Sequence, residues 1–290
     1  MKNYLKAELW KLFRNHLFWA TLAVGILCAV TSAVHACRLY DGELGPAGIL
    51  SRLRSQGDSP KENYLVSMTL YNSWMNAEIQ SPGAKIFFLI TPVLASLPTA
   101  WSFFEEIHSS YLHLLVPKKG RKVYFSAKIL VAFLTGGCLI SLPQLLNLWL
   151  VAMHIPAIRP NVLYSLYASV DHGDLFSGLF YSHPLCFCFA ILGMDFIFGG
   201  LFALMSLAAS FYVRSHLGAV AIPYIVLLVV DACRSFQYYI SYIEISPIFL
   251  LHPNTAPNSV QLPAVIFWEG MLLLVTVPVI LRKGCKLEIL

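Results

Sequence analysis

Two adjacent acidic residues and two histidines form a pattern whose residue types suit acid–base or metal chemistry. Glu105 and Glu106 are followed by His108 and, five residues further on, by His113. Carboxylates and imidazoles exchange protons near neutral pH and bind metal ions. Residues five apart point to different faces of a helix, and dense basic charge follows, so we expect these groups at a membrane surface without a metal. A membrane-embedded hydrolase that uses the four residues is the alternative.

Other sequence signatures of catalysis are missing from the 290 residues. The chain contains no G-x-x-x-x-G-K-[ST] loop to bind nucleotide phosphates, no H-E-x-x-H zinc motif and no G-x-S-x-G nucleophile motif. Its seven cysteines include no C-x-x-C pair, and we interpret them as small buried apolar residues. The sequence therefore predicts no enzyme active site, no metal and no cofactor in this chain.

The composition indicates an integral membrane protein. Hydrophobic residues make up 58% of the chain and charged residues 12%, with a mean hydropathy of +0.68. A soluble domain carries roughly 25% charged residues, about twice as many. The net charge is +5, but the basic residues cluster beside apolar runs and not on a polar face. We therefore expect membrane lipid and no nucleic acid among its partners.

Apolar runs divide the chain into segments that are long enough to cross a bilayer. They predict an all-α membrane protein with one transmembrane domain, residues 1–290, and six spans at 17–36, 85–104, 127–153, 184–211, 217–232 and 264–281. The segments that we assign to the cytoplasmic side hold 13 of the 20 Lys and Arg residues, and the outer segments hold 7. This bias predicts that both termini are cytoplasmic.

Four segments outside the spans have distinct patterns. Residues 1–15 combine an apolar stripe with basic residues, which predicts a helix lying in the membrane interface. Residues 37–84 form a long outer loop, and its part from 62 to 79 is expected to be an amphipathic helix on the outer surface. Residues 105–126 form a cytoplasmic loop. Residues 233–262 are apolar but interrupted by prolines, which favours a re-entrant or surface-lying hairpin on the outer side.

The cytoplasmic loop begins as a short amphipathic helix. Its apolar stripe repeats at spacings of three and four residues and consists of Phe103, Phe104, Ile107, Tyr111, Leu114 and Leu115. Pro117 ends this helix, and Gly120 permits a turn before the next span. A helix of this kind between two spans is suited to contact a soluble partner.

Four ionisable residues lie within or near the predicted spans, where charge is costly. They are Asp195, Asp231, Arg234 and Glu269. Asp231 and Arg234 are three residues apart on one helical face, so we expect them to form a structural ion pair. All four are candidates to line a transport pathway or a subunit seam. Asp195, near the middle of its span, is the foremost of them, and the role of Glu269 is open.

The layout and one local motif resemble the ABC-2 type permeases, the membrane subunits of one class of ATP-binding-cassette exporters. The motif is Leu115-Val116-Pro117-Lys118-Lys119-Gly120-Arg121, preceded by an acidic helix start and followed by Lys128 at the start of a span. The resemblance implies a dimer with a second copy or a homologous permease. It also implies two separate ATPase subunits that hold the ATP and Mg, and a location in the cytoplasmic membrane of the cell.

The resemblance also assigns roles to segments of this chain. Residues 1–15 correspond to the interfacial connecting helix, 105–116 to the coupling helix on the ATPase, and 233–262 to the outer hairpin that closes the exit. The implied ATPase-coupling residues are Glu105 or Glu106, Tyr111, Leu114, Leu115, Pro117 and Arg121. The expected function is export of an amphiphilic cargo such as a lipid, a peptide or an antibiotic. A non-transporting immunity or sensor subunit is a further alternative.

Overall fold

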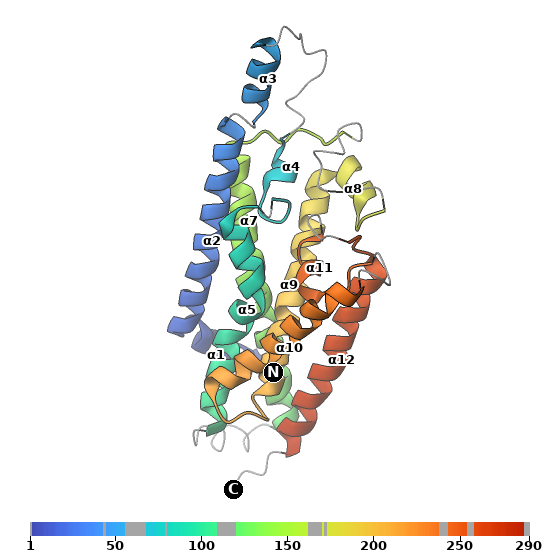
Figure 1. Cartoon of the computed structure of the whole chain (residues 1–290). Helices are drawn as coiled ribbons and strands as arrows, with labels where there is room; N and C mark the ends of the chain where they lie inside the picture. Colours follow the sequence, from blue (N-terminus) through green and yellow to red (C-terminus); the bar gives the residue numbers. More distant parts are fainter. Residues whose placement is uncertain are drawn as a thin grey trace.

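Helices make up nearly all of the ordered architecture in this computed structural model (Figure 1). It describes residues 2–42, 45–55, 68–78, 80–108, 120–161, 170, 173–237, 243–253 and 258–286. No strand forms within these ranges, where a single isolated bridge joins Ile243 and Ser259.

Six of the helices are long and apolar enough to cross a membrane. They are α2 (His16–Asp41), α5 (Pro82–His108), α7 (Arg121–Ala152), α9 (Pro184–Ala209), α10 (His216–Gln237) and α12 (Leu262–Lys286). The predicted class, an all-α multi-pass membrane protein with six spans, is confirmed. Most of these helices extend several residues beyond the predicted apolar runs, because a helix ends where its backbone is capped and not where its polarity changes. The N–H of Gly42, for example, bonds to the carbonyl of Leu39 at the end of α2.

Helix α9 lies in the middle of the bundle and packs against α5, α7, α10 and α12. It is apolar around most of its circumference, as expected of a buried helix. The backbones of α7 and α9 approach most closely at Gly136 and Gly199. A Cβ atom at Gly136 would lie 2.3 Å from the carbonyl oxygen of Gly199, so only glycine fits this crossing.

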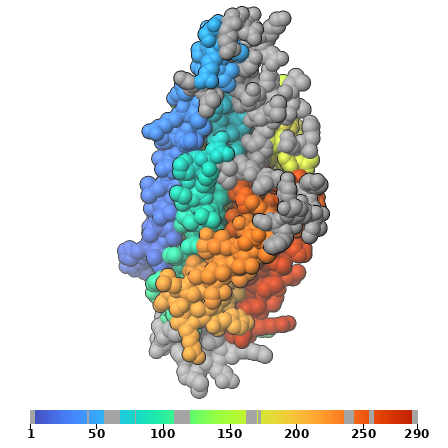
Figure 2. Space-filling model, viewed as in Figure 1, coloured from blue at the N-terminus to red at the C-terminus, as the bar shows by residue number. Residues whose placement is uncertain are grey.

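Helices α2, α10 and α12 form much of the surface in the view of Figure 2, and their outward faces carry large apolar side chains. Large exposed side chains on these faces include Leu27, Val34, Ile225, Val229, Phe267 and Leu274. A soluble protein rarely exposes so continuous an apolar surface, whereas a membrane span requires it.

The two ends of the bundle differ. At one end, which we call the α1 end, α1 (Lys2–Phe13) lies beside the last turns of α5 and the first turns of α7 (Figure 1). At the opposite end, the α3 end, lie α3 (Pro46–Ser55), α4 (Leu70–Ser73) and α8 (Ser177–Ser182). The short α11 (Pro247–Leu250) lies against α10 and α12.

The expected amphipathic surface helix over residues 62–79 is wrong where the structure describes that segment. Only α4 is helical between residues 68 and 78, and Trp74, Met75 and Asn76 are fully buried. The segment can be buried in the bundle because its polar groups form hydrogen bonds there. For example, the N–H of Met75 donates to Asn147 Oδ1 at 2.7 Å. Residues 62–67 and 79 lie outside the described residues.

Candidate functional site

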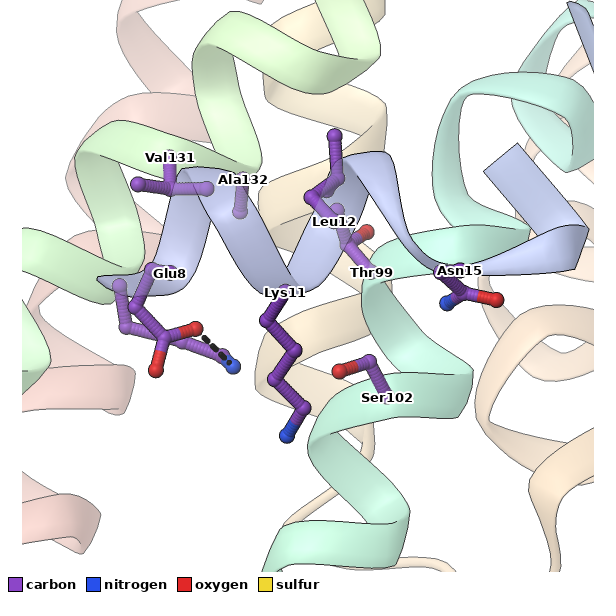
Figure 3. A pocket seen from close by; sticks show the side chains of 9 residues that line it. Glu8, Lys11, Leu12, Asn15, Thr99, Ser102, Val131 and Ala132 are labelled. Carbon is purple, nitrogen blue, oxygen red and sulfur yellow. Dashed lines mark hydrogen bonds and ion pairs between the residues drawn. The ribbon is translucent and has the colours of Figure 1, made fainter. Parts of the chain in front are cut away.

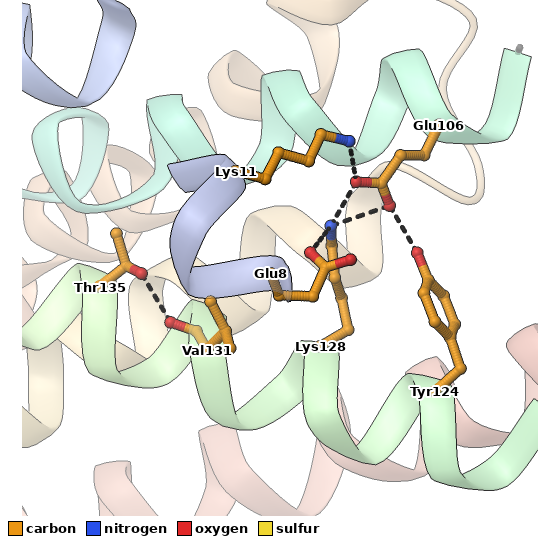
Figure 4. Close-up of polar contacts among 7 residues, drawn as sticks. All are labelled: Glu8, Lys11, Glu106, Tyr124, Lys128, Val131 and Thr135. Atoms are coloured by element: carbon orange, nitrogen blue, oxygen red, sulfur yellow. Dashed lines mark hydrogen bonds and ion pairs between the residues drawn. The ribbon is translucent and has the colours of Figure 1, made fainter. Parts of the chain in front are cut away.

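A buried ion cluster at the α1 end joins three helices (Figure 4). We use this name for Glu8 and Lys11 of α1, Glu106 of α5, and Tyr124 and Lys128 of α7. The Lys128 ammonium is at its centre and donates to Glu106 Oε1 at 2.7 Å, to Glu106 Oε2 at 2.8 Å and to Glu8 Oε2 at 2.7 Å. Glu8 is 8% exposed, Glu106 1% and Lys128 4%.

Two further residues complete the shell around Glu106. Lys11 Nζ donates to Glu106 Oε1, and the Tyr124 hydroxyl donates to Glu106 Oε2. The cluster therefore balances two carboxylates against two ammonium groups, and both oxygens of Glu106 accept hydrogen bonds. Buried charges are tolerated when they are paired and hydrogen-bonded in this way.

Helical spacing brings these side chains together. Glu8 and Lys11 are three residues apart on one face of α1, and Tyr124 and Lys128 are four apart on one face of α7. Glu106 lies in the last turn of α5. From the sequence alone, Lys128 is a basic residue that follows the local motif at the start of a span, and it is not predicted to be the centre of a buried ion cluster. The signal that points to the cluster is the i, i+3 and i, i+4 spacing of polar groups on otherwise apolar faces.

A cavity of about 20 Å³ lies beside the cluster, between α1, α5 and α7 (Figure 3). Its walls include Glu8, Lys11 and Lys128 from the cluster, together with Thr99 and Ser102 of α5. This volume is enough for one water molecule, which would find several polar partners there.

The structure distinguishes the two adjacent glutamates. Glu106 is buried in the cluster, whereas Glu105 is exposed and accepts a hydrogen bond from Trp101 Nε1 at 2.9 Å. Arg121 donates from Nη1 to the carbonyl of Cys285 at 3.0 Å and so joins the start of α7 to the end of α12.

Several residues with predicted roles lie outside the described part of the chain. They are Tyr111, Leu114, Leu115, Pro117 and His113, and the side chain of His108. Within the described ranges, no three His, Cys, Asp or Glu side chains lie close enough together to hold a metal ion.

A second buried polar group, which we call the amide cluster, lies towards the α3 end. It consists of Asn76, Gln144 and Asn147, which carry amides, and Asp195, and all four are 0% exposed. Asn76 Nδ2 donates to Asp195 Oδ2 at 3.2 Å and to the carbonyl of Leu251 at 2.8 Å. Asn147 Nδ2 donates to the carbonyl of Ala29 at 2.8 Å. The cluster thus connects α2, α7, α9 and the chain after α11 through the inserted segment 68–78.

The amide cluster has more acceptors than its donors satisfy. Asp195 Oδ1, Asn76 Oδ1 and the side-chain oxygen of Gln144 make no hydrogen bond in the described part of the chain. The amide of Gln144 lies near enough to Asp195 to interact with it, although it too lacks a hydrogen bond of normal geometry. No described Lys, Arg or His pairs with Asp195, which is fully buried inside the bundle.

We predict that Asp195→Asn raises the free energy of unfolding by about 1–3 kcal/mol. The substitution removes a buried carboxyl that has no cationic partner in the described residues, and its new N–H₂ group can donate to acceptors that lack a donor. SDS titration of the purified chain in micelles measures the change. The matched variant Asn76→Asp adds a second carboxyl to the same cluster and is expected to destabilise the chain. A lower stability of Asp195→Asn than of the wild type would contradict this prediction.

The predicted pair of Asp231 and Arg234 does not form. Asp231 Oδ1 instead accepts a hydrogen bond from the Ser246 hydroxyl at 2.8 Å. Arg234 Nη1 lies 3.9 Å from Glu244 Oε2, and its guanidinium lies 3.8 Å from the ring centre of Phe249. Glu244 is fully buried, whereas Asp231 is half-exposed and can be solvated. An unpaired charge costs more free energy at Glu244, so the arginine lies beside Glu244.

His252 is a buried group that sequence reasoning missed. Its ring lies between Phe88 and Phe249, with centroid distances of 4.7 and 4.9 Å. Burial, and to a smaller degree the charge of Arg234, lowers the pKa of His252 to about 3, so the ring is neutral at physiological pH.

Glu269 is half-buried on α12.

Comparison with known proteins assigns neither a family nor a function to the chain. No protein-family model, no curated protein and no solved structure matches the chain.

Proposed function

We propose that the chain is the membrane subunit of an ATP-driven exporter of the ABC-2 type. In this proposal it works as a dimer, with a second copy or a homologous permease, in the cytoplasmic membrane. Two separate ATPase subunits bind ATP and Mg and supply the energy. The cargo is amphiphilic, of the class of lipids, peptides or antibiotics. The chain itself has no catalytic role.

The ion cluster is the observation that carries this proposal. Residues 105–116, expected to contact the ATPase, begin in the last turn of α5 and are followed along the chain by the first turns of α7. Glu106 in the last turn of α5 binds Tyr124 in the first turn of α7 and Lys128 one turn further on, and Glu8 and Lys11 join both helices to α1. A force applied to the segment between them is therefore transmitted to three helices at once, as a lever requires.

The distribution of basic residues supports the orientation. Lys2, Lys6 and Lys11 lie in α1 and Arg14 directly follows it. Arg121, Lys122 and Lys128 lie in the first turns of α7, and Arg282, Lys283 and Lys286 lie in the last turns of α12. These residues gather at the α1 end, which favours a cytoplasmic position for that end and for both termini. The α3 end is then external, and the hairpin 233–262 closes the exit there. Residues 238–242 and 254–257 of that hairpin lie outside the described residues.

The mechanism follows from these positions. ATP binding brings the two ATPases together, and each pushes residues 105–116 of one permease subunit. The ion cluster passes the movement to α1, α5 and α7, and the two six-helix subunits rock against each other. A path for the cargo then opens between them towards the outside.

The geometry does not favour a hydrolase at Glu106. Both of its oxygens accept hydrogen bonds from Lys128, Lys11 and Tyr124, so neither is available to a substrate or an attacking water. Glu105 is exposed at the end of a span and pairs with Trp101. A transporter and a non-transporting subunit differ in their response to ATP. In a transporter ATP moves the α3 end, and in a non-transporting subunit it does not.

The test is an ATP-dependent movement at the end remote from the ATPase. Cys186 is exposed at the start of α9, and Cys233→Ser removes the other exposed described cysteine. Spin labels on Cys186 of the two copies, in the complex purified from native membranes, report the distance between them. We expect ATP to change this distance, and Leu114→Asp with Leu115→Asp to abolish the change without preventing membrane insertion.

Lys122 is an exposed residue at the start of α7, and Lys122→Gln is the matched control. This variant is expected to show the same ATP-dependent change in distance as the wild type. An ATP response that is the same in the double variant would refute the lever. No response in the wild-type complex would favour a non-transporting subunit.

A further inference from the structure

A groove of about 660 Å³ opens between α1, the start of α2 and the end of α5. Its walls carry two tryptophans, Trp10 and Trp101, and the charged or polar side chains of Lys11, Arg14, His16 and Glu105. Figure 3 shows the small neighbouring cavity, whose walls include Lys11 of α1 and Ser102 of α5, two residues that also line this groove. A volume of this size accommodates a small-molecule headgroup.

The groove lies at the level where a membrane surface is expected. One wall is the beginning of the span that starts at His16, and the other is the end of the span that finishes at Ile107. Trp10 is 62% exposed and the adjacent Phe13 is 55% exposed. Exposed aromatic rings at the ends of spans are typical of the headgroup region of a bilayer. The molecules present there at high concentration are phospholipids.

The charges in the groove are of both signs. The Arg14 guanidinium is exposed, lies 4.5 Å from the ring centre of Trp10, and forms no ion pair in the described part of the chain. Arginine binds phosphate oxygens through two parallel N–H groups. Glu105 supplies a carboxylate beside the Trp101 ring, and a carboxylate next to aromatic rings suits an ammonium group.

Lys11 contributes less positive charge to the groove than Arg14 does, because its ammonium pairs with Glu106. Its side chain is 38% exposed. With Lys11 balanced by the ion cluster, the groove presents one guanidinium and one carboxylate. This combination complements a zwitterion better than it complements a purely anionic headgroup.

We propose that the groove binds the headgroup of a phospholipid that carries both a phosphate and a primary ammonium group, as phosphatidylethanolamine does. Arg14 contacts the phosphate, Glu105 accepts from the ammonium, and Trp10 and Trp101 flank the headgroup. Because α1 carries part of the ion cluster, the bound lipid holds α1 against α5.

Lipid-dependent thermal stability tests this proposal. The full-length chain is purified in detergent micelles that contain phosphatidylethanolamine, phosphatidylglycerol or phosphatidylcholine with identical acyl chains. We expect phosphatidylethanolamine to raise the Tm by about 4 °C at saturating lipid and the other two lipids to raise it less. Arg14→Gln is expected to abolish the shift. Glu105→Gln is expected to remove the preference for phosphatidylethanolamine over phosphatidylglycerol.

Lys6→Gln is the matched control, since Lys6 is an exposed basic residue of α1 that does not line the groove. It is expected to behave as the wild type. A full phosphatidylethanolamine shift in Arg14→Gln would overturn the proposal, and so would a larger shift with phosphatidylglycerol in the wild-type chain.

Discussion

Replacing Lys128 by Met is expected to destabilise the chain by about 3–5 kcal/mol, the cost of leaving buried carboxylates without their partner. In the described part of the chain Glu8 pairs with Lys128 alone, so the substitution leaves it buried and unpaired. Glu106 is less affected because it keeps Lys11 and the Tyr124 hydroxyl. SDS titration of the purified chain gives the free energy of unfolding.

A second substitution makes this prediction specific. Glu8→Gln removes the carboxylate that Lys128→Met leaves unpaired, so the double variant is expected to be more stable than Lys128→Met alone, although Glu8→Gln by itself costs about 1–2 kcal/mol. If the double variant loses the sum of the two single losses, the residues are not coupled and the described cluster does not hold α1 to α7.

Replacing Gly136 by Val is expected to prevent α7 and α9 from packing and to abolish the monodisperse folded chain on size-exclusion chromatography. A Cβ atom there would lie 2.3 Å from the Gly199 carbonyl oxygen and 2.7 Å from Ala203 Cβ, both on a helix that packs on four others. The contact with the Gly199 oxygen is to backbone, so no side-chain rotation relieves it. Even Gly136→Ala is expected to be destabilising.

Gly193 provides the matched control on α9. A Cβ atom at Gly193 would meet nothing within 4 Å, and alanine favours a helix over glycine by about 1 kcal/mol. Gly193→Ala is therefore expected to fold as well as the wild type or better. Normal folding of Gly136→Val would mean that the two helices do not cross as described.

The spans could be predicted from the sequence because each depends on a continuous run of apolar residues, a local property. The two polar clusters could not, because their members are distant in the chain. Lys128 and Glu8 are separated by 120 residues, and Asn76 and Asp195 by 119. Only the packing of α1 on α7, and of segment 68–78 against α9, brings these groups together.

Two incorrect predictions have the same origin. The amphipathic pattern of residues 62–79 states that one face is apolar but not whether membrane or protein covers it, and Trp74 proves to be buried in the bundle. The spacing of Asp231 and Arg234 permits a pair, but Glu244, ten residues after Arg234 and fully buried, competes for the arginine. Local spacing indicates which contacts are possible, and tertiary structure selects among them.

The central claim, that a separate ATPase subunit drives this chain, is tested most directly by photolabelling. The complex is purified from native membranes in mild detergent and exposed to 8-azido-ATP. We predict that the label attaches to a co-purified partner subunit and that the preparation hydrolyses ATP. A preparation without a labelled partner that still moves its cargo would contradict the claim, as would label attached to this chain itself.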